Sequence, residues 1–238
     1  PAYCIYAFNT MKAIVGTGTQ NQTNAYLYTT INGGQNWTPT NVSGITGFVN
    51  SIYFFDDNEG IFIGDPKNGK WGIGRTTDGG VTWVPITNIG LPNTNETGFV
   101  SSSFRSGDYL WFGTNGGRVF YSTDRGISWN FTRIPNAVIV SYLAFRDDLM
   151  GLAVYTESSD INAERFLATT TDGGKTWMTR QYNFTQNGYI PIHLFAPQNS
   201  RLIYVLCAGG EIFGTSDLGN NWLPVLNEYT GTIQMGTS

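Results

Sequence analysis

Short apolar runs separated by turn-forming residues make up almost the whole chain. Between residues 49 and 86, the runs 49–55, 60–64, 71–77 and 83–86 are rich in β-branched and aromatic side chains, and Gly, Pro, Asn and Asp interrupt them. Runs of this length and composition are typical of β-strands. No segment of the chain shows a helical period. We therefore predict four strands in this stretch and an all-β protein.

The same plan occurs five times along the sequence. The first repeat predicts strands at 3–8, 13–17, 25–30 and from 37 onward, the third at 100–104, 109–113, 118–122 and 129–133, the fourth at 140–145, 151–155, 165–170 and 177–181, and the fifth at 192–195, 202–206, 211–215 and 222–225. All five repeats are complete.

A turn of eight residues marks each repeat. It is clearest at Thr76–Trp83, and close copies stand at Thr30–Trp37, Ser122–Trp129, Thr170–Trp177 and Thr215–Trp222. The steps between the five tryptophans are 46, 46, 48 and 45 residues. A period of this size is expected of a four-stranded propeller blade.

The residue types of this turn have a physical reason. Asp followed by Gly between two β-rich runs predicts a hairpin, in which Gly adopts the positive φ that other residues resist. The Asp carboxylate can accept backbone N–H bonds across the turn, and the preceding Ser or Thr hydroxyl can join that network. We expect the Trp to open the next strand and to bury about 150–250 Å².

The pattern Ser/Thr-x-Asp-x-Gly-x-Thr/Ser-Trp resembles the Asp-box, or BNR repeat, of sialidases, sortilin-like receptors, xyloglucanases and photosystem II assembly factors. The resemblance implies a β-propeller of five four-stranded antiparallel blades, or six or seven blades if the chain is a fragment. Its structural Asp-box residues are Asn32, Trp37, Asp78, Trp83, Asp124, Trp129, Asp172, Trp177, Asp217 and Trp222.

Length and composition fit one propeller domain. Of the 238 residues, 40% are hydrophobic and 15% aromatic, which is ample for a core. Because the repeat runs from end to end, we expect a single domain over 1–238, with blades at about 1–45, 46–92, 93–137, 138–186 and 187–238.

Charge and cysteine usage limit the partners. The net charge is −4 and no Lys/Arg cluster occurs, which makes nucleic acid an unexpected partner. No apolar run approaches the length of a membrane span. Only 13% of residues are charged, and many are Gly, Asn, Thr or Ser, which fits an extracellular β-protein. We expect a processed or trimmed piece of a longer product, because the chain begins at Pro1.

Two further segments narrow the resemblance. Gly64–Trp71 ahead of one Asp-box and Leu110–Phe120 ahead of the next are similar to secreted BNR propellers of Bacteroidota that carry a type IX secretion sorting domain. This resemblance implies secretion or attachment to the cell surface, and it implies no reaction. It also allows assembly with further domains of a longer parent chain.

Two features raise the question of glycoside hydrolysis. The triplet Arg133-Ile134-Pro135 matches one that opens sialidase domains, but here it follows the third Asp-box, so we interpret it as accidental. The pairs Asp56-Asp57 and Asp147-Asp148 recur at equivalent turns between the first and second strands of a repeat. Recurrence at a turn favours a structural role, because Asp bonds its own backbone there.

A ligand site is expected on the face opposite the Asp-boxes. The loops there vary most between repeats, and the longest are 17–24, 65–70, 86–98, 156–164 and 182–189. Seven residues in or beside them are candidates for binding a glycan or a peptide: Asp65, Lys67, Trp71, Glu157, Asp160, Arg165 and Tyr189. The alternative is that these loops are simply solvated, with a Trp packed beneath them.

The remaining candidates are His193, Cys4 and Cys207. His193 is the sole histidine, and we expect it in the core or lining the channel. The chain offers no partners for a metal site, and no nucleophile, nucleotide or cofactor pattern occurs. The cysteines are predicted to form a disulfide between the first and fifth blades, if five blades close on themselves. That closure is open, because Thr230–Met235 is also compatible with the first strand of a sixth blade.

The sequence thus predicts a secreted or cell-surface propeller that binds protein or glycan ligands without catalysis. The alternative is a glycoside hydrolase of the sialidase or xyloglucanase type. Two carboxylates converging among the loops at about 5–10 Å would favour the enzyme.

Overall fold

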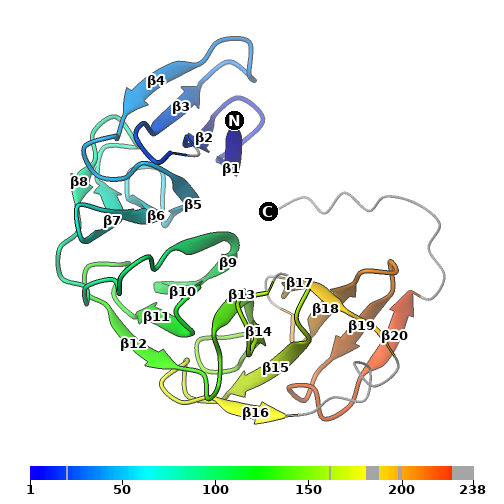
Figure 1. Ribbon diagram of the computed structural model, residues 1–238. Coiled ribbons are helices and arrows are strands. Elements are labelled where there is room, and N and C mark those ends of the chain that lie inside the picture. Colours follow the sequence, from blue (N-terminus) through cyan, green and yellow to red (C-terminus); the bar gives the residue numbers. More distant parts are fainter. Residues whose placement is uncertain (20, 161, 181–187, 198–199, 227–238) are drawn as a thin grey trace. The chain divides into compact units, whose positions relative to one another are not determined.

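The computed structural model consists of five four-stranded antiparallel sheets (Figure 1). It describes all residues except 20, 161, 181–187, 198–199 and 227–238. The sheets comprise β1 (Ala2–Ala7), β2 (Ala13–Thr17), β3 (Tyr26–Thr30) and β4 (Thr38–Asn41); β5 (Val49–Phe54), β6 (Gly60–Lys67), β7 (Lys70–Thr76) and β8 (Val84–Pro85); β9 (Gly98–Ser106), β10 (Tyr109–Thr114), β11 (Arg118–Ser122) and β12 (Asn130–Arg133); β13 (Ile139–Phe145), β14 (Gly151–Thr156), β15 (Arg165–Thr170) and β16 (Met178–Arg180); and β17 (Pro191–Phe195), β18 (Ile203–Cys207), β19 (Ile212–Thr215) and β20 (Leu223–Leu226). In each sheet the strands pair in chain order.

Each sheet falls within one of the five predicted blade segments, and we call the sheets blades 1 to 5. The described part of the chain contains no helix, and hence none that is long and apolar enough to cross a membrane. The box tryptophans were predicted to open the fourth strands. Instead each lies one residue before its strand. In the first four boxes the indole nitrogen donates to a glycine carbonyl of the turn, which keeps the Trp in the turn.

The chain packs as two compact units. Unit 1 comprises Pro1–Val100 and Ser122–Asn130, which are blades 1 and 2 with the third Asp-box. Unit 2 comprises Ser101–Tyr121 and the described residues from Phe131 onward, which hold the rest of blade 3 with blades 4 and 5. The interpretation of 1–238 as a single domain stays a prediction.

Neighbouring blades within a unit share a hydrophobic core. In unit 1, Ile14 and Leu27 of blade 1 pack with Phe54 and Phe62 of blade 2. In unit 2, one cluster joins blade 3 to blade 4 and another joins blade 4 to blade 5. Alternation along the strands produces this arrangement, because successive side chains point to opposite faces of a sheet. Blade 4 therefore presents one apolar set to blade 3 and another to blade 5 within unit 2.

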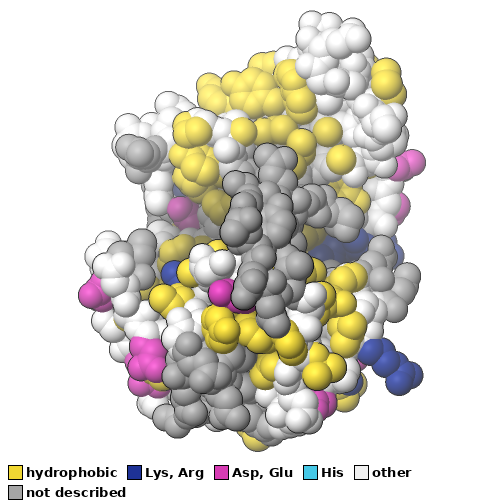
Figure 2. Space-filling model, turned by 90° about the vertical axis from the view of Figure 1, so that its right-hand side faces the viewer, with side chains coloured by type: hydrophobic (Ala, Val, Ile, Leu, Met, Phe, Trp, Pro, Cys, Tyr) yellow, Lys and Arg dark blue, Asp and Glu magenta, His cyan; other side chains and the backbone are white. Residues whose placement is uncertain are grey.

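Hydrophobic side chains also reach the surface (Figure 2). Ile5 on β1 is 53% exposed, whereas Ile52, at the equivalent position on β5, is 4% exposed. Ile52 belongs to the core between blades 1 and 2. Within the described residues of unit 1, no sheet precedes blade 1 to cover Ile5. Trp37 of the same blade is 38% exposed, whereas Trp177 of blade 4 is 6% exposed.

Candidate functional site

The second Asp-box shows how the repeated turn is held together. Thr76 Oγ1 donates to Asp78 Oδ1 at 2.8 Å and accepts the N–H of Gly80 at 3.0 Å. Asp78 Oδ1 also accepts the backbone N–H of Thr82, and its Oδ2 accepts the Thr82 hydroxyl at 2.6 Å. Trp83 Nε1 donates to the carbonyl of Gly80 at 3.0 Å. The network predicted for Asp and hydroxyl is confirmed, and it fixes the Trp as well.

The other four boxes repeat this network with small substitutions. In the first, Asn32 Oδ1 accepts from Thr30 and from the N–H of Asn36. In the fifth, an amide replaces the hydroxyl, and Asn221 Nδ2 donates to Asp217 Oδ2 at 2.6 Å. The full pattern recurs around the carboxylates of the third and fourth boxes, Asp124 and Asp172.

These hydrogen bonds stabilise the charged form of the carboxylates. Bonds from the side chain and backbone of Thr82 and from the Thr76 hydroxyl lower the pKa of Asp78 to about 2. The backbone and side-chain bonds of Asn221 lower the pKa of Asp217. Around Asp124 and Asp172, burial raises the pKa, but the hydrogen bonds outweigh it and the net shift is downward. The box carboxylates are therefore saturated anionic acceptors.

The two central positions of the turn differ in what they tolerate. Both adopt positive φ, but the first is Arg125 (φ 59°) in the third box and Leu218 (φ 57°) in the fifth. The second is Gly in all five copies. A Cβ on Gly80 would lie 2.7 Å from Ile14 Cδ1, so the second box also lacks space there, whereas a Cβ on Gly34 would come no closer than 3.8 Å to its neighbours. The first position can carry a side chain at the cost of a left-handed conformation.

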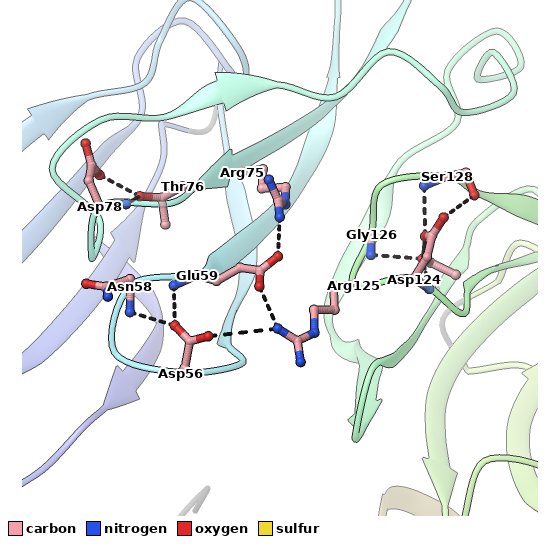
Figure 3. Close-up of polar contacts among 11 residues, drawn as sticks. Asp56, Asn58, Glu59, Arg75, Thr76, Asp78, Asp124, Arg125, Gly126 and Ser128 are labelled. Carbon is pink, nitrogen blue, oxygen red and sulfur yellow. Dashed lines mark hydrogen bonds and ion pairs between the residues drawn. The ribbon is translucent and has the colours of Figure 1, made fainter.

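Arg125 uses this position to reach the neighbouring blade within unit 1 (Figure 3). Its Nη1 donates to Glu59 Oε2 at 2.6 Å and lies 3.8 Å from Asp56 Oδ2. Glu59 also pairs with Arg75 through its other oxygen, Oε1. The Arg125 guanidinium lies 5.5 Å from the centre of the Phe55 ring. The Arg125 guanidinium thus links the third box to the turn between β5 and β6. Glu59 and Asp56 both lie beside an arginine.

The Asp pairs at these turns are structural, as expected. Asp56 Oδ1 accepts the N–H groups of Asn58 and Glu59 at 2.8 and 2.7 Å. Asp147 Oδ1 accepts the corresponding N–H groups of blade 4. Asp148 accepts the hydroxyl of Ser106 at 2.9 Å. These first acids of each pair cap their own turns.

Asp65 lies on β6 and not in a loop, which corrects the predicted loop 65–70. The strands β6 and β7 are joined by Asn68 and Gly69, both at positive φ, as in a tight hairpin. Asp65 is 6% exposed and accepts from Gln22 Nε2, Asn50 Nδ2 and the N–H of Gly98. Burial raises its pKa, while the bonds from Asn50 and Gly98 oppose the rise. Its oxygens are already used inside unit 1.

Lys67 and Trp71 are also engaged by the scaffold of unit 1. Lys67 Nζ donates to the carbonyls of Thr23 and Ser43, which are both in blade 1. Trp71 is 3% exposed and belongs to the interior. The exposed tip of the β6–β7 hairpin is therefore the part of this predicted ligand surface that remains accessible.

The other four candidates lie in unit 2. Glu157 and Asp160 are exposed in the loop between β14 and β15, where Asp160 accepts the N–H of Asn162. Arg165 begins β15 and donates to the carbonyl of Pro191 at 2.6 Å. Tyr189 packs against Phe213, with ring centres 5.1 Å apart. Most of the predicted loop 182–189 lies outside the described residues, and so does Thr230–Met235.

His193 lies on β17, the first strand of blade 5. Its ring centre is 5.7 Å from that of Tyr142 on β13, and burial lowers its pKa. Its Nδ1 atom is buried without a hydrogen-bond partner in the described part of the chain. Within that same part, no three His, Cys, Asp or Glu side chains are grouped to hold a metal ion.

The two cysteines are free thiols in the structure, one in each unit. Cys4 Sγ lies 3.8 Å from the carbonyl oxygen of Val49 in blade 2. Cys207 packs in the core between blades 4 and 5. Burial raises the pKa of both thiols to about 12, helped at Cys207 by the charge of Glu211. The predicted disulfide stays a prediction, to be tested by mass spectrometry of the unreduced, alkylated protein.

Sequence reasoning missed three contacts that the structure places together. These are the Glu59–Arg125 pair, the amide groups around Asp65, and the contact of the Tyr142 and His193 rings. The exception Arg125, where three other boxes have Gly followed by Gly, was a usable signal for the first. The other two depend on pairing between repeats, which composition does not reveal. Arg133 is exposed at the end of β12.

Comparisons with known proteins agree with this architecture. The BNR/Asp-box repeat family matches residues 120–131, which contain the whole third box. A search of curated proteins found no match. Many solved structures resemble the chain.

Two kinds of protein illustrate the structural likeness. YCF48 bound to D1 peptide has a TM-score of 0.60 at 21% identity, over 93% of this chain and 67% of its own. YCF48 from Cyanidioschyzon merolae has a TM-score of 0.61 at 16% identity, over 94% and 71%. The GH74 xyloglucanase from Xanthomonas campestris has a TM-score of 0.64 at 13% identity, over 94% of this chain and 38% of its own.

At these identities the likeness establishes the fold and nothing more. The chain spans about two thirds of the first YCF48 structure and well under half of the xyloglucanase. Together with the five sheets and their turns, the comparisons define an all-β propeller protein with BNR/Asp-box repeats.

Proposed function

We propose that this propeller is a non-catalytic module that binds a protein ligand. The observation that carries the proposal is the state of its carboxylates. Asp78 and its counterparts serve the box turns, Asp56 and Asp147 cap other turns, and Asp65 is enclosed by three donors. A glycosidase needs one carboxylic acid and one carboxylate facing a sugar bond. Of the two buried acids in the described part of the chain, Asp65 accepts from three donors and Glu96 accepts a backbone N–H, so the scaffold engages both.

The similarity to YCF48 supports a protein as the ligand. That neighbour is described with a bound D1 peptide, so a fold of this kind accommodates a polypeptide. The low charge of the sequence and its resemblance to secreted Bacteroidota propellers support a site of action outside the cell or at its surface. Assembly with other domains of a longer parent chain fits the same proposal.

A display screen of random peptides against the immobilised protein tests the binding role. We expect an enriched set of sequences, and each should bind the soluble protein in a separate titration. Failure to enrich any sequence over a bare-resin control would count against the proposal. A parallel glycan array shows whether a glycan binds instead.

Hydrolysis assays test the enzymatic alternative with the same preparation. We expect no release from xyloglucan or from a fluorogenic sialoside. Turnover that disappears in Glu157→Gln or Asp160→Asn would assign an active site to the exposed loop of blade 4. Sialoside release that disappears in Arg133→Ala would show that the Arg-Ile-Pro triplet is functional.

A further inference from the structure

Arg165 is a half-buried arginine that forms no ion pair with an acid in the described part of the chain. Arg75, Arg125 and Arg146 each pair with a carboxylate. Arg165 Nη1 donates to the carbonyl of Pro191, and the guanidinium lies 5.8 Å from the centre of the Tyr142 ring. A guanidinium has five N–H donors, so most of its capacity is unused.

The repeat does not require an arginine at this place. The position five residues before each Asp-box is occupied by Ala25, Trp71, Gly117, Arg165 and Gly210. All five blades form a four-stranded sheet of the same order although this residue differs, so the sheet does not depend on an arginine there. A cation at this position in blade 4 alone indicates a function specific to that blade.

His193 adds a second polar group beside the same ring. Tyr142 and His193 stand at equivalent positions on β13 and β17, since they pair with Val154 and Leu206 on the following strands. His193 is partly exposed, and its Nδ1 has no partner among the described residues. A neutral imidazole can donate from one nitrogen. The Tyr142 ring therefore has a cation near it on one strand and an imidazole on another.

We propose that Arg165, Tyr142 and His193 form a binding site for a carboxylate of a peptide ligand, either its C-terminus or an acidic side chain. The proposal rests on the protein-binding function inferred above. A carboxylate is planar and accepts two parallel bonds from a guanidinium. A phosphate would carry nearly two negative charges and meets only one cation here. Tyr189, two residues before Pro191, packs on Phe213 and offers an aromatic surface near the strand start.

The single histidine makes the test direct. Its Hε1 ring proton gives a single signal of that kind in a proton NMR spectrum, and titration with sodium acetate reports a carboxylate that binds beside it. We expect a saturable shift of this signal. We also expect the His193 pKa to rise by roughly one unit with acetate bound, because a nearby negative charge favours the imidazolium. The Glu211 carboxylate, on the turn after β18, is present with and without acetate. Any effect it has on the His193 pKa therefore cancels when the two states are compared.

Matched variants identify the binding group. Arg165→Gln should abolish the saturable shift, and Arg165→Lys should weaken it, because an ammonium lacks the bidentate geometry. Arg201→Gln removes an exposed arginine from the same unit and should change nothing. Circular dichroism and thermal melting establish that each variant folds. Sodium chloride at matched ionic strength controls for screening.

The outcomes separate this site from the proposed function. An acetate response that survives in Arg165→Gln, or that chloride reproduces, would overturn the site. So would the absence of any saturable response in the unmodified protein. Peptides from the display screen provide the second arm, in which amidation of the C-terminus and of acidic side chains should reduce binding at least tenfold. Peptides that bind equally well after amidation would refute the site and leave the binding function intact.

Discussion

The Asp-box turns and the strand starts around Arg165 are both rich in polar groups, but they use them in opposite ways. In the second Asp-box, Asp78 accepts hydrogen bonds from the backbone N–H and the hydroxyl of Thr82 and from the Thr76 hydroxyl. At the start of β15, Arg165 makes one hydrogen bond and forms no ion pair with an acid in the described residues. A polar group whose hydrogen bonds are made within the protein serves the fold. Unused donors on a half-buried side chain mark a group that is available to a ligand.

The comparison also separates what repeats from what does not. The box network is present in every blade, including those where Asn32 or Asn221 replaces the usual residue. Arg165 and His193 occur once each at their positions. Substitutions in the turns should therefore affect stability, and substitutions around Arg165 should affect binding.

The largest effect is expected at a buried box tryptophan. Trp177→Ala should lower the free energy of unfolding by roughly 3–5 kcal/mol, because it removes a 6%-exposed indole and its bond to Gly174. Trp37→Ala is the matched control, since the same side chain is 38% exposed in the first box. Urea unfolding measures both variants. Equal losses would contradict the difference in packing described for blades 1 and 4.

A box carboxylate should follow in size. Asp172→Ala removes the acceptor of the Thr170 hydroxyl and of the N–H and hydroxyl of Thr176. We expect a loss of about 1–3 kcal/mol in the same unfolding assay. Glu164→Ala, which removes an exposed acid near the start of β15, should change stability by less than about 0.5 kcal/mol. A silent Asp172→Ala would show that the network contributes little.

Acid should weaken the boxes in a defined pH range. Because the folded pKa of Asp78 is lowered to about 2, its contribution is complete above its unfolded pKa of about 4. The contribution is lost as the pH falls from there through the folded value. Melting temperatures measured from neutral pH down to about pH 2 should therefore decline below pH 4. Asp78→Asn should flatten this decline, and an identical slope would argue against the assignment.

The smallest effect on stability is expected at Arg165. Arg165→Gln loses one hydrogen bond to a carbonyl, so the free energy of unfolding should fall by no more than about 1 kcal/mol. Chemical denaturation of this variant beside Arg201→Gln tests the point. A loss as large as that of Trp177→Ala would show that Arg165 holds blades 4 and 5 together, and the ligand site would lose its basis.

Much of the fold could be predicted because turn-forming residues mark the ends of the strands in each repeat. Strands Ala13–Thr17, Arg118–Ser122 and Arg165–Thr170 have the predicted bounds, since Thr, Ser and Gly of the following or preceding turns end them sharply. The prediction failed at Asp65–Lys70. Asn68 and Gly69 form a tight turn there, and β6 and β7 continue up to it on either side.

The candidate site was harder to predict, because polar residue type does not reveal engagement. Asp65 and Lys67 looked available in the sequence, yet their partners are Asn50 in the same blade and Thr23 in blade 1. Arg165 was named as a candidate, but its neighbour Tyr142 was not. Their proximity depends on how strand starts of adjacent blades meet, and one repeat by itself does not contain that information.

Hydrogen exchange with and without a selected peptide tests the division between scaffold and site most directly. We expect new protection at the starts of β13, β15 and β17, near Tyr142, Arg165 and His193, in the peptide-bound protein. The five Asp-boxes should exchange at the same rate in both states. Protection confined to the boxes, with no change around Arg165, would contradict the account.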